Sequence, residues 1–147
     1  MIDEKKEKEL MELAIKASEG SYSPYSNFAV GAAILCDDGE IFTGSNIENA
    51  SYGAAICAER TAAAYAAHKK NRKFLAVAVY GSPKGATGDE LQYAFPCGIC
   101  RQFLNEFSVE NMVVLIGKSK DDYIKTTLED LLPNSFGPED LDMEKHM

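Results

Sequence analysis

Apolar positions along the chain form a helical stripe first and then short, continuous runs. In residues 3–19, leucine and alanine recur at steps of three and four between lysines and glutamates, which predicts an amphipathic helix. Later runs such as FAVGAAIL and FLAVAVY have the length of buried strands. The predicted elements are a helix at 3–19, strands at 28–35 and 40–44, a helix at about 57–70, a strand at 74–80, a helix at about 98–106, strands at 112–116 and 123–126, and a helical turn at 128–132.

The order of these elements predicts the fold class. Strands that are apolar on both faces must be covered on both sides, and the order α-β-β-α-β-α-β-β supplies helices for both. We therefore predict an α/β fold with three layers (α/β/α), a mixed sheet of about five strands and helices on both faces. Asp37-Asp38-Gly39 predicts a hairpin turn between the first two strands. A single domain is expected at 1–136, followed by an acidic C-terminal tail at 137–147 that frays.

Composition and charge narrow the possible partners. The chain has 147 residues, of which 46% are hydrophobic and 26% charged, as in an ordinary globular protein. Its net charge of -8 disfavours a nucleic-acid partner, because proteins that bind phosphate backbones usually carry a basic patch. No apolar run approaches the roughly 20 residues that cross a bilayer, and the charged N-terminal segment lacks the apolar core of a signal peptide. We expect a cytoplasmic protein, without a membrane partner, that acts on a small molecule.

Two cysteine motifs carry the candidate chemistry. Cys57-Ala58-Glu59-Arg60 and Pro96-Cys97-Gly98-Ile99-Cys100 each stand where a helix is predicted to begin. In a reducing compartment such a pattern favours a metal site over disulfides, and three thiols suit a zinc ion (Zn²⁺, one per chain) with an open coordination position. Of the other possible ligands, we expect Cys36 to be an inert thiol and both histidines, His68 and His146, to be solvated.

The spacing within the first motif predicts where its helix begins. Cys57 and Glu59 are two residues apart and would diverge inside a helix, so they can serve one site only if Cys57 lies at the N-cap. Cys97 and Cys100 are three apart and face the same side of a helical turn. Glu59, free of the metal, can transfer protons, and Arg60 can donate to thiolate sulfur and offset its negative charge. This set suits metal-assisted hydrolytic deamination of a small amidine-like ring.

These motifs resemble those of the zinc-dependent cytidine and deoxycytidylate deaminases, and more closely the short, homotetrameric cytidine deaminases. The resemblance covers nearly the whole chain. Beyond the cysteine motifs, it includes the segments at 23–33 (SPYSNFAVGAA), 46–52 (NIENASY) and 131–136 (LLPNSF). Cys57 stands where relatives that act on RNA, DNA or nucleotides usually carry histidine, which favours a free nucleoside as substrate.

The resemblance implies a reaction, an assembly and a set of site residues. The reaction is hydrolytic deamination of cytidine and 2′-deoxycytidine in pyrimidine salvage, by a homotetramer in which each pocket is completed by a neighbouring subunit. Glu59 is the implied catalytic residue, and Cys57, Cys97 and Cys100 are the implied zinc ligands. The implied substrate contacts are Phe28 on the pyrimidine, Asn46 and Glu48 on the ribose hydroxyls, and the backbone of Ala58 and Glu59 on the base edge; those from the neighbouring subunit are Ala50, Tyr52 and Phe136.

Several alternatives remain open from the sequence. A deaminase for a modified cytosine nucleoside of the blasticidin type would use a similar three-cysteine site. A non-catalytic, zinc-stabilised domain would need a fourth ligand. An RNA- or DNA-editing deaminase is disfavoured by the acidic charge and by Cys57. At the level of single residues, Phe28 could be ordinary core, Asn46 and Glu48 could cap their own loop, and Phe136 could pack locally.

Overall fold

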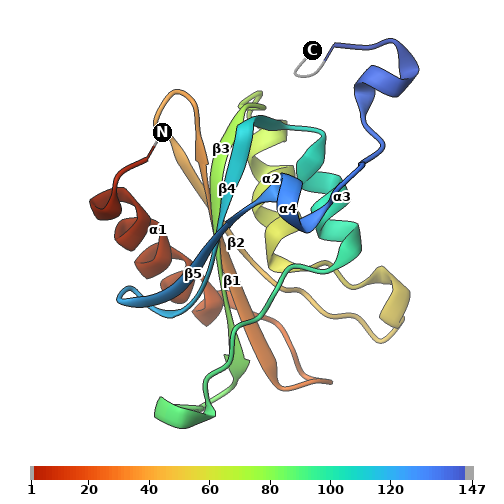
Figure 1. Cartoon of the computed structure of the whole chain (residues 1–147). Helices are drawn as coiled ribbons and strands as arrows, with labels where there is room; N and C mark the ends of the chain where they lie inside the picture. The colour runs from red at the N-terminus through yellow and green to blue at the C-terminus, as the bar shows by residue number, and fades with distance from the viewer. Residues whose placement is uncertain (1, 145–147) are drawn as a thin grey trace.

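The computed structural model describes residues 2–144, in which five strands form one mixed sheet in the order β2-β1-β3-β4-β5 (Figure 1). The β3–β4 pair is parallel and the other three pairs are antiparallel. Both edge strands are therefore hairpin partners of their neighbours. The strands are β1 (Phe28–Cys36), β2 (Ile41–Ser45), β3 (Phe74–Pro83), β4 (Ser108–Ser119) and β5 (Asp122–Thr127).

Helices cover both faces of this sheet, as the sequence predicts. α1 (Glu4–Ala17) lies on one face, and α2 (Ala58–His68) and α3 (Gly98–Asn105) lie on the other, with the short α4 (Leu128–Leu131) after β5. Successive strand residues point to opposite faces and enter separate cores. Ala33, Ala76, Ala78 and Leu115 pack with α1, whereas Ala32, Ile34, Val77, Val79, Val114 and Ile116 pack with α2 and α3. The three-layer α/β fold is confirmed.

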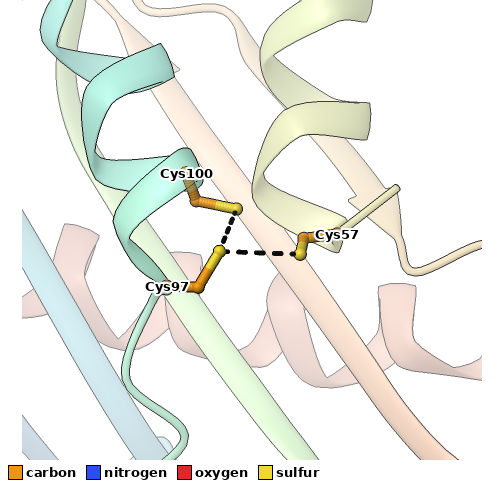
Figure 2. Close-up of side chains that lie close together, drawn as sticks. All are labelled: Cys57, Cys97 and Cys100. Carbon is orange, nitrogen blue, oxygen red and sulfur yellow. Dashed lines mark hydrogen bonds between the residues drawn. The ribbon is translucent and has the colours of Figure 1, made fainter. Parts of the chain in front are cut away.

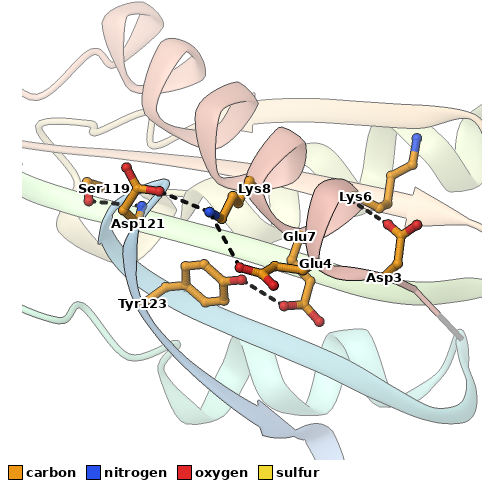
Figure 3. A network of polar contacts seen from close by, with 8 residues as sticks. All are labelled: Asp3, Glu4, Lys6, Glu7, Lys8, Ser119, Asp121 and Tyr123. Carbon is orange, nitrogen blue, oxygen red and sulfur yellow. Dashed lines mark hydrogen bonds and ion pairs between the residues drawn. The ribbon is translucent and has the colours of Figure 1, made fainter.

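A polar network fastens α1 to the hairpin of β4 and β5 (Figure 3). The carboxylate of Glu7 is 5% exposed and accepts from Tyr123 Oη at 2.7 Å and from Lys125 Nζ at 2.6 Å. Lys8 pairs with Asp121 at 3.2 Å on the same side. Because the buried carboxylate of Glu7 is paired and hydrogen-bonded, it is tolerated at this interface. The network lies on the α1 face of the sheet, so the α2/α3 face is left for the cysteine motifs.

α2 approaches the sheet more closely than an ordinary side chain would permit. A Cβ placed on Gly44 in β2 would lie 2.5 Å from the backbone nitrogen of Ala62 and 3.0 Å from the carbonyl oxygen of Ala58. Ala62, Ala63 and Ala66 are fully buried on the inner side of the helix. Small residues on both surfaces thus set the position of the first turn of α2, which follows Cys57.

The strands around the site are longer than the sequence predicts. Glycine and proline predict a loop from Gly81 onward, but β3 continues through Pro83 because these residues pair with Phe28 to Val30 of β1. β4 begins at Ser108 rather than Met112. A strand's ends depend on its partner in the sheet, which is distant in sequence, so local composition underestimates them.

The segment after residue 136, which the sequence predicts to fray, begins with a regular turn. Pro138–Leu141 forms a 3₁₀ turn, Pro138 is buried, and Gly137 N donates to Asp140 Oδ2 at 2.9 Å. Gln102 and Asn105 of α3 donate to the carbonyl oxygen of Phe136, which precedes this turn. Local composition cannot reveal such a long-range contact. His68 is exposed, as predicted, and His146 lies outside the described residues. Among residues 2–144, no helix is long and apolar enough to cross a membrane.

Candidate active site

Two helix N-termini meet at the cysteine motifs. α2 begins at Ala58 and α3 at Gly98, and each is preceded by a cysteine N-cap with extended backbone: φ −73°, ψ 157° for Cys57 and φ −73°, ψ 170° for Cys97. The predicted boundary at Cys57 is confirmed. An extended N-cap turns its side chain away from the helical path, so thiols from both caps can face one point. The free N–H groups and dipole of each N-terminus favour negative charge there.

The three thiols of the motifs converge (Figure 2). The Sγ atoms of Cys57 and Cys97 are 3.9 Å apart, those of Cys97 and Cys100 are 3.5 Å apart, and all three lie within 4.8 Å of one another. Tetrahedral zinc with Zn–S bonds of about 2.3 Å separates its sulfur ligands by about 3.8 Å. The donor set therefore fits zinc. In the described chain, no fourth His, Cys, Asp or Glu joins this cluster, which leaves one corner of a tetrahedron open.

The thiols differ in charge because they share hydrogen bonds. A hydrogen bond from the Cys100 thiol, with further donation by Arg60 and Cys97, lowers the pKa of Cys57 to about 5. The same hydrogen bond, together with burial, raises the pKa of Cys100. Arg60 Nη2 lies 4.0 Å from Cys57 Sγ and 3.4 Å from the carbonyl oxygen of Ala55. Its Nε is buried and has no acceptor within residues 2–144, so the guanidinium is held at the thiols at some cost.

Glu59 is a buried carboxyl next to this cluster. Its residue is 4% exposed, and burial raises its pKa to about 7. The negative charge of Cys57 raises the pKa further, whereas a hydrogen bond with Cys100 and the charge of Arg60 lower it. A carboxyl with a pKa near neutrality can both accept and return a proton, which is what general acid–base catalysis requires.

The loop at 46–52, which is predicted to bind the sugar, is hydrogen-bonded to the segment just before α2. Ile47 and Ile56 form an isolated antiparallel bridge, with both N–H···O distances at 2.9 Å. Ile56 directly precedes Cys57, and Ile47 separates Asn46 from Glu48. Both predicted sugar-binding residues therefore lie beside the start of α2. No sequence periodicity in residues 40–59 predicts this proximity.

Glu48 is oriented by the loop before β1. Its Oε1 accepts from the backbone N–H groups of Tyr25 at 3.0 Å and Ser26 at 3.1 Å, and its Oε2 accepts from Ser26 Oγ. The Ser26 hydroxyl and these backbone donors hold the pKa of Glu48 below its usual range, so the side chain is an ionised acceptor. One lone-pair direction of Oε2 is left for a further donor.

Asn46 organises the entrance to β1. Its Oδ1 accepts from Ser21 Oγ at 2.5 Å and from Val30 N at 2.9 Å, and its Nδ2 donates to the carbonyl oxygen of Phe28 at 2.9 Å. Both lone pairs of the amide oxygen are thus used and one N–H remains. Asn46 can donate one hydrogen bond to a ligand while it fixes Phe28. The hydrogen bonds of Ser21 and Ser26 with Asn46 and Glu48 could not be predicted, because contacts between residues about 20 positions apart leave no signal in sequence spacing.

A groove lies along the outer side of this loop. It has a volume of about 330 Å³ and is lined by Tyr25, Ser26, Glu48, Asn49, Tyr52 and Ala55. The rings of Tyr25 and Tyr52 meet edge to face with centroids 5.7 Å apart, and Tyr52 is 75% exposed. Ala50 is exposed as well, and Ala58 is buried in the first turn of α2. Phe136 does not line this groove in its own chain and lies against α3 with 58% of its surface exposed.

Comparison with known proteins agrees with this geometry. Residues 4–116 match the model of the cytidine and deoxycytidylate deaminase zinc-binding region. A cytidine deaminase of Halalkalibacterium halodurans is 42% identical over 132 residues, covering 90% of this chain and 95% of the relative. The crystal structure of cytidine deaminase from Burkholderia pseudomallei superposes with a TM-score of 0.76 at 42% identity, covering 87% of this chain and 97% of that one. That from Mycobacterium tuberculosis gives 0.71 at 37% identity, covering 88% and 95%. The chain belongs to the cytidine and deoxycytidylate deaminase family.

Proposed function

We propose that this protein is a zinc-dependent cytidine deaminase that converts cytidine and 2′-deoxycytidine to uridine and 2′-deoxyuridine with release of ammonia. The observation that carries the proposal is the convergence of three thiols on one point beside the buried carboxyl of Glu59. Family membership and the names of the relatives support the same reaction.

The chain's own residues have distinct parts in this reaction. Cys57, Cys97 and Cys100 hold the zinc ion, one per chain, which when bound supplies a Lewis acid that activates water. Glu59 takes one proton from the attacking water and gives it to the ring nitrogen of the base. It then takes the proton of the hydroxyl added to the ring carbon and gives it to the amine, which leaves as ammonia when the C–N bond breaks; the burial of Glu59 keeps both protons within the site. Arg60 offsets the negative charge that three thiolates place around the metal.

The nucleoside lies between the thiols and the sugar loop. Phe28 stacks on the pyrimidine from the entrance of β1, and the backbone at Ala58 and Glu59 contacts the base edge at the free N–H groups of α2. Asn46 donates its remaining N–H to a ribose hydroxyl, and Glu48 accepts from one. The bonds from Ser21 and Ser26 support this arrangement, because they fix both side chains before the ligand arrives.

A homotetramer completes the pocket in this proposal. Ala50, Tyr52 and Phe136 each contribute to a neighbouring subunit's site, and their exposure in the single chain supports that role. Residues 1–136 form the catalytic domain. We place the protein in the cytoplasm, in pyrimidine salvage, with a free nucleoside rather than a nucleic acid or a membrane as its partner.

The direct test is turnover measured together with metal content. Purified protein is assayed for zinc and incubated with cytidine, deoxycytidine and a modified cytosine nucleoside antibiotic, and product is followed by ultraviolet absorbance and ammonia release. The proposal predicts one zinc per chain and faster conversion of the two plain nucleosides. Zinc-loaded protein that converts neither plain nucleoside would refute the proposal. Faster conversion of the antibiotic would show that modified cytosine nucleosides are the substrate class.

A further inference from the structure

Three side chains on α3 bind the carbonyls of the C-terminal segment that passes beside it. Arg101 Nη1 donates to the carbonyl oxygen of Leu131 at 2.8 Å. Gln102 Nε2 and Asn105 Nδ2 both donate to that of Phe136, at 2.9 Å and 3.2 Å. In Figure 1 this segment, in blue, runs from α4 past α3 and ends in a turn that stands away from the sheet. The contacts are made by side chains to backbone, so they fix the path of the segment whatever its own side chains do.

The backbone of Phe136 is held by hydrogen bonds, although its side chain is exposed. Asn105 is only 8% exposed, so breaking its hydrogen bond to the Phe136 carbonyl would leave a buried amide without a partner, which is costly. Immediately afterwards Gly137 and Pro138 are buried, and Gly137 N donates to Asp140 Oδ2. The backbone is therefore held at the Phe136 carbonyl and in the turn that follows.

The side chain of Phe136 contrasts with its backbone. More than half of it, 58%, is exposed, although a phenylalanine that packs within its own chain is normally buried. The ring borders a small hollow of about 200 Å³ beside Gln102 and Phe107, but these neighbours leave most of it exposed. A fixed backbone with an exposed aromatic ring is typical of a side chain that is presented to another surface. Holding the ring in advance removes most of the ordering cost from the binding step.

We propose that Gln102 and Asn105 are positioning residues for Phe136, which hold its ring where a neighbouring subunit's nucleoside pocket receives it. This inference rests on the proposed function, in which Phe136 contributes to that pocket. Because Cys97 and Cys100 stand at the start of the same helix, α3 then serves the metal of its own subunit and the substrate of the next. Neither amide touches the substrate.

The chain offers a clean reporter for this arrangement because it contains no tryptophan. Phe136→Trp places a single tryptophan, which can be excited selectively over the tyrosines, at the presented position. In that background Gln102→Glu keeps the shape of the side chain but removes the donor, and Gln102→Lys restores a donor. We expect Gln102→Glu to shift the tryptophan emission to the red and to speed its depolarisation, and Gln102→Lys to reverse part of both changes. Asn105→Ser, combined with Gln102→Glu, should enlarge them.

Steady-state kinetics of variants that keep the native Phe136 supply the second readout. We expect Gln102→Glu to raise KM for cytidine roughly threefold to tenfold with kcat nearly unchanged, since only uniform binding is lost. Zinc content and oligomer mass should match the parent. Glu12→Gln, an exposed change on α1 far from the C-terminal segment, is the control and should leave KM and the emission as they are.

The outcomes separate this proposal from the reaction itself. If Phe136→Ala raises KM but the Gln102 and Asn105 variants change neither KM nor the tryptophan signal, the positioning role is refuted and the deaminase proposal stands. If Phe136→Ala leaves KM unchanged while cytidine is still converted, the positioning role is refuted too. Absence of all turnover would refute the proposed reaction, and the tryptophan signal would still decide whether the two amides hold residue 136. Gln102 is exposed, so its variants test the idea even if Asn105→Ser fails to fold.

Discussion

The two cysteine helices begin alike and are held in place by different means. Each starts after a cysteine N-cap with extended backbone. α2 is rich in alanine and is positioned by close backbone contact with β2 at Gly44. α3 buries Cys100, Leu104 and Asn105 on its inner side and is tied to its surroundings by polar side chains, with Arg101 donating to the carbonyl oxygens of Pro96 and Leu131 at 2.8 Å each.

This difference matches what each helix supplies. The N-cap and first turn of α2 carry one thiol together with the two charged groups of the site, Glu59 and Arg60. The N-cap and first turn of α3 carry two thiols and no acidic residue. The buried carboxyl of Glu59 and the unpaired, buried Nε of Arg60 are costly, so they need a rigid, close-packed frame, and contact with the sheet provides it. The ligand pair on α3 needs only a correct turn, so that helix can also hold the C-terminal segment.

Removing a thiol from α3 should have the largest effect. We expect Cys100→Ser to lose most of its zinc and all measurable deamination, because two remaining thiolates no longer form the set of three protein ligands that a catalytic zinc site requires. Metal content per chain and cytidine turnover are measured on the same sample. Cys36→Ala is the control, since Cys36 is buried in β1 away from the cluster and its pKa is raised to about 12 by burial. Equal zinc loss in both variants would contradict the assignment.

The contrast in packing predicts opposite outcomes for two glycines. Gly44→Ala places a methyl group against the backbone of Ala62, so the start of α2 must move; we expect a loss of about 2 kcal/mol in the free energy of unfolding and weaker zinc binding. Gly98→Ala at the start of α3 has open space around the new Cβ and should be neutral or slightly stabilising. Chemical denaturation and zinc competition measure both. Similar losses of unfolding free energy in the two variants would contradict the claim that α2 and α3 are held in place by different contacts.

Glu59 should lower the stability of the metal-free protein at high pH. Its folded pKa is raised from 4.5 to about 7, so the folded state binds more protons in that window and stability falls as pH rises through it. Above the window, Glu59→Gln should therefore be more stable than the parent by about 3 kcal/mol, and below pH 4.5 the difference should vanish. Denaturation of chelator-treated protein across pH tests this. The exposed Glu19→Gln should show no such crossover; a pH-independent gap for Glu59→Gln would rule out the buried charge as its cause.

Arg60 should have a smaller effect than either Glu59 or the thiols. Arg60→Gln removes the positive charge near Cys57 without removing a metal ligand, so we expect zinc to be retained and kcat/KM to fall about tenfold, the value of one charge-assisted hydrogen bond. Steady-state kinetics and metal analysis measure the two quantities. Lys16→Gln, at an exposed position on α1, is the control. Full loss of zinc in Arg60→Gln would show that the guanidinium is needed for metal binding itself.

Features with a local physical signature could be predicted from the sequence. The two-residue spacing of Cys57 and Glu59 fixed the start of α2, and continuous apolar runs located the strands, because helix caps and buried strands depend on near neighbours. Contacts that join distant segments could not be found in this way. Ser21 and Ser26 bond to Asn46 and Glu48 because Tyr22 pairs with Ile47. The ordered turn that follows Phe136 comes after a carbonyl group that two amides of α3 bind.

The central claim is that Glu59 transfers protons beside a metal held only by thiols. It is tested most directly by Glu59→Gln, assayed for zinc content and cytidine turnover in parallel with the unmodified protein. We predict one zinc per chain in both proteins and a loss of about 10²–10⁴-fold in kcat for the variant. A variant that keeps both its zinc and its turnover would contradict the claim, because the buried carboxyl would then have no part in the reaction.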